Sequence, residues 1–150
     1  MPPRLILAAR SGFWAATMRA ELAEAGLRLH EAGTLEAAWR QLDEAPASFV
    51  IAELTRPNAA RLVDCLFNLS RVRPRARAAV VAARALADYA GLMREAGAVH
   101  FTCNPRRLGP LIDAACRHLA AAPAEVPASL TDRIWSTLPW AKSPWPPAEA

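Results

Sequence analysis

The chain has 150 residues, the size of a single domain with at most a short appendage, and its formal net charge is +4. Lys142 is the only lysine, so the positive charge is almost all arginine, and no apolar run approaches the ~20 residues that a membrane-spanning helix needs. Three cysteines without CxxC spacing argue against a disulfide framework and a common zinc pattern, and they favour a reducing, cytoplasmic location.

Strand and helix patterns alternate along most of the chain. Short apolar or alternating runs predict five strands, at residues 5–9, 27–32, 49–54, 78–83 and 98–103. Apolar residues at helical spacing predict five helices, at residues 13–25, 35–44, 59–71, 86–96 and 110–122. Gly26 is suited to end the first helix, Thr34 to cap the second, and Pro110 to occupy the first turn of the last.

The run from Phe49 to Leu54 organises the predicted fold. It is apolar except for Glu53, and a Pro57–Asn58 turn follows it, which is typical of a strand buried on both faces of a parallel sheet. The alternation predicts an α/β protein with a five-stranded parallel sheet in the order 2-1-3-4-5, as in a flavodoxin-like three-layer sandwich. Because ligands collect beyond the carboxyl ends of such strands, Glu53 lies where a site is expected.

Several short motifs occur at the spacing of one known family. They are Leu22-x-x-x-Gly26, Glu31-Ala32-Gly33-x-x-Glu36-Ala37, Arg56-Pro57, Ala96-Gly97-Ala98 and Asn104-Pro105. With the order of the predicted elements, they make residues 4–122 resemble a receiver domain of the bacterial response-regulator family, which serves two-component signal transduction. The resemblance implies phosphoryl transfer to an aspartate at the end of the third strand. It also implies an acidic pair after the first strand that holds Mg²⁺, a Thr or Ser that ends the fourth strand, and a Lys before the Pro that follows the fifth.

None of those functional residues is present in this chain. By the family's spacing, the aspartate position is Glu53, the acidic pair falls on Ala9 and Arg10, the hydroxyl position is Ala82, and the lysine position is Asn104. Magnesium needs carboxylate oxygens, and phosphoryl transfer needs positive charge beside the transferring group. The sequence therefore predicts a pseudo-receiver that is not an enzyme and holds no metal or cofactor.

Three residues carry more specific hypotheses. Glu53 and Arg10 either form an ion pair in place of carboxylate and Mg²⁺, or Glu53 is simply solvated at the end of its strand. Phe101 occupies the position of the family's switch-like aromatic, but it has no hydroxyl group, and packing in the core is the favoured interpretation.

The composition changes after residue 123, so the chain is divided into a receiver-like domain at 1–123 and a Pro/Trp-rich tail at 124–150. A capping box starting at Ser129 predicts a short helix near 129–138. Apolar residues that are candidates for binding a partner follow that helix and the segment after it: Leu130, Ile134, Trp135, Leu138, Trp140 and Trp145. Such a helix is too short to be stable alone, so it docks either on its own domain or on a partner.

These observations predict a phosphorylation-independent, receiver-like signalling or adaptor protein that acts through protein–protein contacts. The resemblance implies a homodimer through the face formed by residues 86–96, 98–103 and 110–122. One alternative is a nucleic-acid-associated regulator that uses the arginine-rich loop 71–77. Another is a sensor of small anions at the strand ends, where Arg10, Arg84 and Asn104 would meet. No membrane contact is expected.

Overall fold

The computed structural model describes residues 1–122. Its strands are β1 (Leu5–Ala8), β2 (Leu29–Ala32), β3 (Phe49–Leu54), β4 (Arg77–Ala82) and β5 (His100–Thr102). Its α-helices are α1 (Gly12–Ala25), α2 (Leu35–Glu44), α3 (Ala59–Val72), α4 (Ala90–Ala96) and α5 (Gly109–Ala121), and a 3₁₀ segment, η1 (Arg84–Tyr89), precedes α4.

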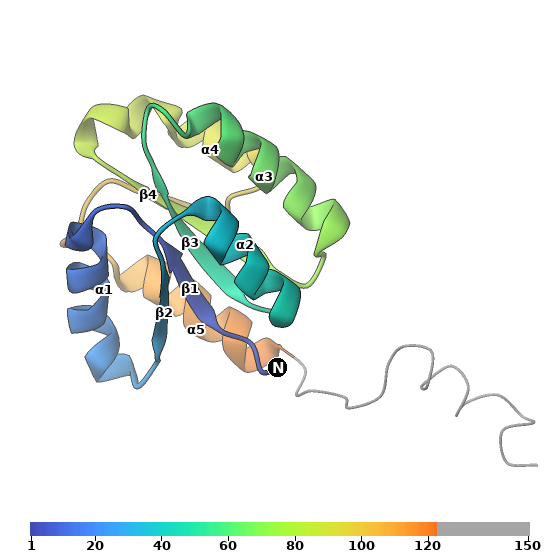
Figure 1. The fold of residues 1–150 in the computed structure, drawn as a ribbon. Helices are drawn as coiled ribbons and strands as arrows, with labels where there is room; N and C mark the ends of the chain where they lie inside the picture. Colours follow the sequence, from blue (N-terminus) through green and yellow to red (C-terminus); the bar gives the residue numbers. More distant parts are fainter. Residues whose placement is uncertain (123–150) are drawn as a thin grey trace, which may run out of the picture.

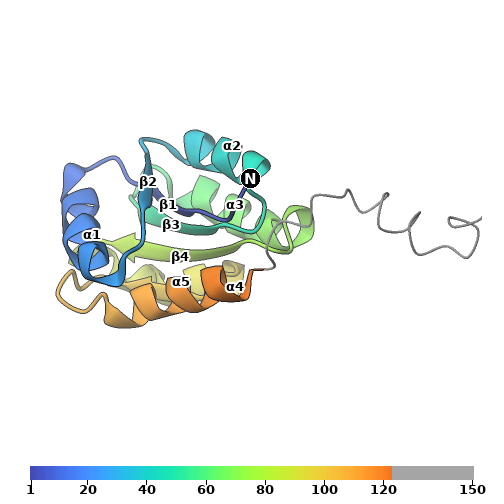
Figure 2. The ribbon, with the colours of Figure 1, turned by 90° about the horizontal axis from the view of Figure 1, so that it is seen from below.

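The five strands form one parallel sheet in the order β2-β1-β3-β4-β5, which confirms the predicted fold class. β3 pairs with β1 on one side and with β4 on the other, and it is the central strand (Figure 1). Figure 2 shows the sheet between α2 on one side and α1 and α5 on the other. The switch point of this order lies beside β1, so the loops after β1, β2 and β3 open toward one crevice.

Alternate residues of each central strand point into different halves of the core. Ile6, Val50 and Val80 pack in the cluster that includes side chains of α2, α3 and α4. Leu7, Ile51 and Val81, the next residue in each strand, pack with side chains of α1 and α5. Full burial of one such aliphatic side chain contributes about 1.5–3 kcal/mol, so the two half-cores hold the strand ends, and therefore the loops beyond them, in fixed positions.

β4 is unusually rich in alanine. Ala78, Ala79 and Ala82 are completely buried in it, and their methyl groups face both layers of helices. Side chains this small allow helices to approach the sheet closely, and close packing leaves little room for a larger group.

The predicted caps agree with the structure. The Thr34 hydroxyl accepts a hydrogen bond from the Ala37 backbone N–H, and Gly26 has the left-handed conformation with φ of 68°. Pro110 lies in the first turn of α5. The predicted helix 86–96 differs from the structure, since its first half is 3₁₀. Leu86 is the one buried residue in that half. With so little packing against the core, the segment forms a short 3₁₀ turn and does not extend the α-helix.

β5 is shorter than the predicted run 98–103. It lies at the sheet edge and pairs with β4 alone, so its ladder extends only from His100 to Thr102. Among residues 1–122, no helix is long and apolar enough to cross a membrane. The division near residue 123, the helix near 129–138 and the tail's apolar residues lie outside the described residues.

Candidate functional site

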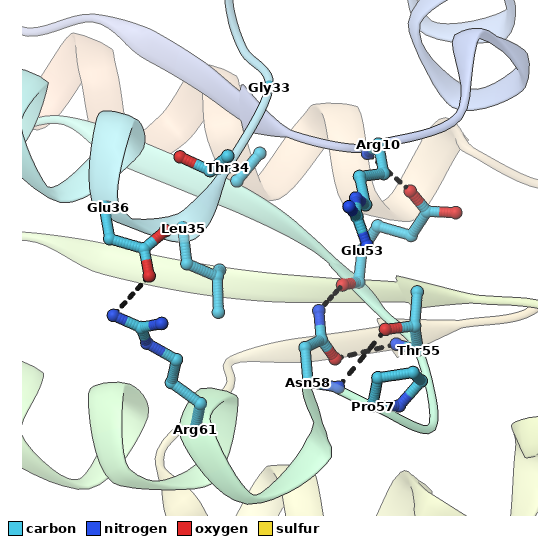
Figure 3. A pocket seen from close by; sticks show the side chains of 11 residues that line it. Arg10, Gly33, Thr34, Leu35, Glu36, Glu53, Thr55, Pro57, Asn58 and Arg61 are labelled. Atoms are coloured by element: carbon cyan, nitrogen blue, oxygen red, sulfur yellow. Dashed lines mark hydrogen bonds and ion pairs between the residues drawn. The ribbon is translucent and has the colours of Figure 1, made fainter.

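A pocket of about 290 Å³ opens at the carboxyl ends of β1, β2 and β3, and we call it the switch-point pocket (Figure 3). Residues from the loops after these strands and from the first turns of α2 and α3 line it: Ala8, Arg10, Gly33, Thr34, Leu35, Glu36, Glu53, Thr55, Pro57, Asn58 and Arg61. The sheet order therefore brings together segments that are far apart in the sequence.

Glu53 is bound by the loop between β1 and α1. One oxygen of its carboxylate, Oε2, accepts hydrogen bonds from the backbone N–H groups of Arg10 at 2.9 Å and Ser11 at 3.3 Å. The other, Oε1, accepts one from the Ser11 hydroxyl at 3.0 Å. Ser11 immediately precedes α1, so the carboxylate lies at the positive end of that helix, where negative charge is stabilised.

The side chains of Glu53 and Arg10 do not form the predicted ion pair. Arg10 contacts Glu53 through its main-chain N–H, and its guanidinium has no hydrogen bond or ion pair in this part of the chain. Charge complementarity suggested the correct neighbours but the wrong atoms. The alternative of a merely solvated glutamate is also incomplete, because both oxygens accept hydrogen bonds.

The turn after β3 is closed by Asn58. Its side-chain oxygen accepts a hydrogen bond from the Thr55 backbone N–H at 2.8 Å, and its side-chain nitrogen donates to the Glu53 backbone carbonyl at 2.8 Å. The Asn58 backbone N–H donates in turn to the Thr55 hydroxyl at 3.3 Å. This set of bonds fixes the end of β3, and with it the backbone of Glu53, on the wall of the pocket.

An ion pair joins the two helices on the other wall. Arg61 of α3 contacts Glu36 of α2, and Figure 3 shows the two side chains directed toward each other. The pKa of the Glu36 carboxyl is lowered, first by a hydrogen bond from its own backbone N–H and then by Arg61 and Thr34. Internal carboxylates thus occupy the positive ends of both α1 and α2.

A second cavity, of about 730 Å³, lies on the other side of Glu53, and we call it the carboxyl-edge cleft. The start of α1, Glu53 and the loops after β4 and β5 line it: Ser11, Phe13, Trp14, Glu53, Ala82, Ala83, Arg84, Cys103, Asn104, Pro105 and Arg106. Asn104 lies in a turn, and its side-chain oxygen accepts from the Arg106 backbone N–H at 3.0 Å. The structure therefore places Glu53, Ala82 and Asn104 around one cleft, and Arg10 in the neighbouring pocket.

Phe101, His118 and Cys103 lie in surroundings that indicate structural roles. Phe101 is buried in the core, as the favoured interpretation expected. Nε2 of His118 lies 2.9 Å from the Ala47 carbonyl oxygen, and its ring packs against Phe49. Burial raises the pKa of the Cys103 thiol, so this cysteine is protonated at neutral pH. Residues 1–122 contain no group of three His, Cys, Asp or Glu side chains that could hold a metal ion.

The arginine-rich loop is partly occupied by contacts within the protein. Arg73 pairs with Asp43 of α2, and one nitrogen of Arg77 donates to the carbonyls of Pro74 and Ala76, both at 2.8 Å. These contacts divert two of the four arginines between residues 71 and 77 from a phosphate backbone. They therefore weaken the nucleic-acid alternative.

Sequence reasoning missed three residues of this region. The sequence pattern does not assign Ser11 to the site, and it does not pair Glu36 with Arg61. The Ser11 contact had a weak signal, since Ser11 marks a helix N-terminus, where a carboxylate is stabilised. The Glu36–Arg61 contact had none, because its partners lie on different helices.

The sequence matches no protein-family model and no curated protein. The structure is similar to a response regulator from Thermotoga maritima, with a TM-score of 0.66 and 17% identity over 81% of this chain and 100% of that chain. It is also similar to the receiver domain of NtrC4 from Aquifex aeolicus, with a TM-score of 0.60 and 18% identity over 80% of this chain and 98% of that chain. A third similar structure is a CheY-like protein, TadZ, from Pseudomonas aeruginosa PAO1, with a TM-score of 0.61 and 20% identity over 85% of this chain and 100% of that chain. The chain therefore has the fold of a response-regulator receiver domain.

Proposed function

We propose that the protein is a phosphorylation-independent, receiver-like adaptor that acts through protein–protein contacts. The observation that carries the proposal is the state of Glu53. Its two carboxylate oxygens accept three hydrogen bonds from the β1–α1 loop, at 2.9, 3.3 and 3.0 Å. These bonds lower the nucleophilicity of the carboxylate, because they stabilise its negative charge and occupy three of its roughly four lone-pair sites.

The surroundings of Glu53 support the same conclusion. Ala9 and Arg10 offer no carboxylate for Mg²⁺, which prefers oxygen ligands in octahedral geometry. Asn104 carries no positive charge, and its side-chain oxygen is engaged by the loop that follows β5. Phosphoryl transfer depends on positive charge placed around the transferring group, and the positions that supply it by resemblance do not do so here.

Incubation with acetyl phosphate and Mg²⁺ tests this part of the proposal. We expect no added phosphoryl mass on the full chain by intact-protein mass spectrometry, with a receiver domain that has the complete residue set as the positive control. Magnesium-dependent labelling that disappears in Glu53→Gln would overturn the proposal. Labelling elsewhere on the chain would persist in that variant, so the site of modification is identified by the same experiment.

The face formed by α4, β5 and α5 is the proposed contact surface on the described domain. Leu92 on α4 is 46% exposed and Val99, just before β5, is 50% exposed, so apolar side chains are accessible there. One of the similar structures is described as a beryllofluoride-activated dimer of the NtrC4 receiver domain. We propose a homodimer through this face in the present chain.

Sedimentation velocity over a range of concentrations tests the homodimer. We expect Leu92→Arg to weaken self-association, because the charge would be buried without a partner. Phe67→Arg is the matched control, since Phe67 is 62% exposed on α3. Equal effects of the two substitutions, or a wild-type protein that stays monomeric, would exclude this dimer.

The tail, at residues 124–150, is the second proposed surface. Deletion of these residues distinguishes the two interpretations of its tryptophans. A large fall in the melting temperature supports docking on the same domain. Unchanged stability together with loss of a captured protein partner, restored when the tail is added back, supports docking on that partner.

A further inference from the structure

The carboxyl-edge cleft has features that contact with another protein does not explain. Its volume of about 730 Å³ falls in the range of small-molecule sites, which is roughly 300–1,000 Å³. Its lining includes the buried residues Ala82 and Trp14 and the exposed Ala83, so part of the cleft surface is apolar. Polar side chains line it as well, from Ser11 before α1, from Glu53 on β3 and from the loops that follow β4 and β5.

Two arginines line the cleft and have no side-chain partner among residues 1–122. Arg84 begins the segment after β4, and Arg106 lies in the loop after β5. Neither guanidinium forms a hydrogen bond or ion pair with any residue between 1 and 122. The acidic residue of the lining is Glu53, whose carboxylate is already engaged by the β1–α1 loop. The cleft therefore carries an excess of available positive charge.

A guanidinium group binds carboxylates and phosphates with two parallel hydrogen bonds, which an ammonium group cannot do. The charge and the donor geometry of Arg84 and Arg106 thus favour binding of an anion. A metal cation would be repelled by the same two arginines. Burial keeps the Cys103 thiol protonated, so binding at this lining would not be covalent.

An aromatic side chain completes the cleft. Phe13 is 56% exposed in the first turn of α1, and its ring meets the buried ring of Trp14 edge to face, with centroids 5.4 Å apart. A single exposed phenylalanine is ordinary on a protein surface. This one lines the same cleft as the two free guanidinium groups, and it contacts the Trp14 ring, which also lines the cleft. Aromatic rings and guanidinium planes both stack on planar groups, so this lining suits a ligand with a planar apolar body.

We propose that the carboxyl-edge cleft binds, without covalent chemistry, a small organic anion whose negative group is carried on a planar ring. Arg84 and Arg106 hold the negative group, and Phe13 stacks on the ring. The shared chemistry covers a mononucleotide and an aryl carboxylate. This activity goes beyond the adaptor role, and neither depends on the other.

Isothermal titration of the full chain with paired probes tests the proposal. The probes are adenosine monophosphate against adenosine, and benzoate against benzamide, with inorganic phosphate as the anion that has no ring. We expect one of the two aromatic anions to bind at least about tenfold more tightly than its neutral parent and than phosphate. The pair that shows the difference identifies the negative group as phosphate or carboxylate.

Substitutions then locate the site. Arg84→Gln and Arg106→Gln should each weaken binding about tenfold, and Phe13→Ala several-fold. Arg28→Gln removes the same charge from an exposed arginine before β2. Arg28 forms no hydrogen bond or ion pair in the described part of the chain and does not line the cleft, so this variant should leave affinity unchanged. All four side chains are exposed, and urea unfolding of each variant checks that its fold is retained.

Two results would overturn the proposal. One is that neither aromatic anion binds more tightly than its neutral parent at concentrations up to about 10 mM. The other is that Arg28→Gln weakens binding as much as Arg84→Gln, which would mean a diffuse effect of charge. Both results would leave the acetyl phosphate experiment, and hence the adaptor role, unaffected.

Discussion

Removal of one methylene group from Glu53 gives the sharpest test of the hydrogen bonds that hold it. In Glu53→Asp the carboxylate withdraws by about 1.5 Å, the length of one carbon–carbon bond. The three contacts at 2.9, 3.3 and 3.0 Å then exceed hydrogen-bond range unless the loop moves. The substitution is conservative in charge and restores the residue type that the resemblance implies, yet we expect it to destabilise the domain.

The magnitude follows from the number and exposure of the lost bonds. Each hydrogen bond contributes about 0.5–1.5 kcal/mol net, and the released donors are near solvent, so their rehydration recovers part of that energy. We expect Glu53→Asp to lower the free energy of unfolding by about 1–2 kcal/mol. Glu53→Gln keeps an oxygen that can accept from both backbone N–H groups, so it should lose only about 0.5 kcal/mol.

Equilibrium unfolding in urea measures the relative stabilities of these variants, with tryptophan fluorescence, to which the buried Trp14 contributes, as one probe. Glu95→Gln is the control, because Glu95 is exposed on α4 and has no partner in the described part of the chain. A Glu53→Asp variant as stable as wild type, or less affected than Glu53→Gln, would refute the reasoning.

A double-mutant cycle tests which atoms of Arg10 matter. Because the contact is made by the main chain, Arg10→Ala retains the N–H that Glu53 accepts from. The effects of Arg10→Ala and Glu53→Gln should therefore add to within about 0.5 kcal/mol. A coupling energy well above 1 kcal/mol would indicate that the guanidinium and the carboxylate do interact in solution.

Three further predictions concern stability. Gly97→Ala should lower the free energy of unfolding by more than about 1 kcal/mol, because φ is 121° there and the new Cβ would lie 3.3 Å from the Leu66 carbonyl oxygen. Gly91→Ala, inside α4, should instead raise it by up to about 1 kcal/mol. Thermal melts in which both variants shift the melting temperature in the same direction would contradict this prediction. The pKa of His100 is lowered, first by burial and then by Arg94, so the folded state disfavours its protonation. The stability that neutral His100 provides is therefore present above the unfolded pKa of about 6.5 and is lost as the pH falls through the folded pKa. His100→Gln should make the urea midpoint fall less steeply between about pH 7 and 5. The same pH dependence in wild type and variant would refute this prediction. His118→Phe should lower the unfolding free energy by about 1 kcal/mol, since it keeps the ring contact but loses the bond to a carbonyl before β3; an unchanged urea midpoint would show that the bond contributes nothing.

The fold was accessible from the sequence because its signals are local and mutually consistent. The apolar run from Phe49 to Leu54 predicted a doubly buried central strand, and its burial confirms this. Thr34 and Gly26 predicted helix ends through their own side-chain and backbone chemistry. Each of these signals depends on residues within a few positions, so no tertiary information was needed to interpret them.

The site was less accessible, for a physical reason. The sequence identified Glu53 and its neighbours, but it suggested a guanidinium partner because side-chain charge is visible in a sequence and main-chain N–H groups are not. The pair of Glu36 and Arg61 depends on how α2 and α3 sit on the sheet, and local spacing carries no information about that. The 3₁₀ turn before α4 depends in the same way on the single buried anchor, Leu86.

The alanines of β4 limit how this chain can change during evolution. Ala78, Ala79 and Ala82 are already the smallest side chains that still pack, and no solvent reaches them. Growth to valine would force the layers apart at a typical cost of about 1–3 kcal/mol, while loss to glycine would loosen the strand. Few substitutions at these three positions are therefore neutral for stability, and most tolerated variation should accumulate in the exposed positions of the surrounding helices.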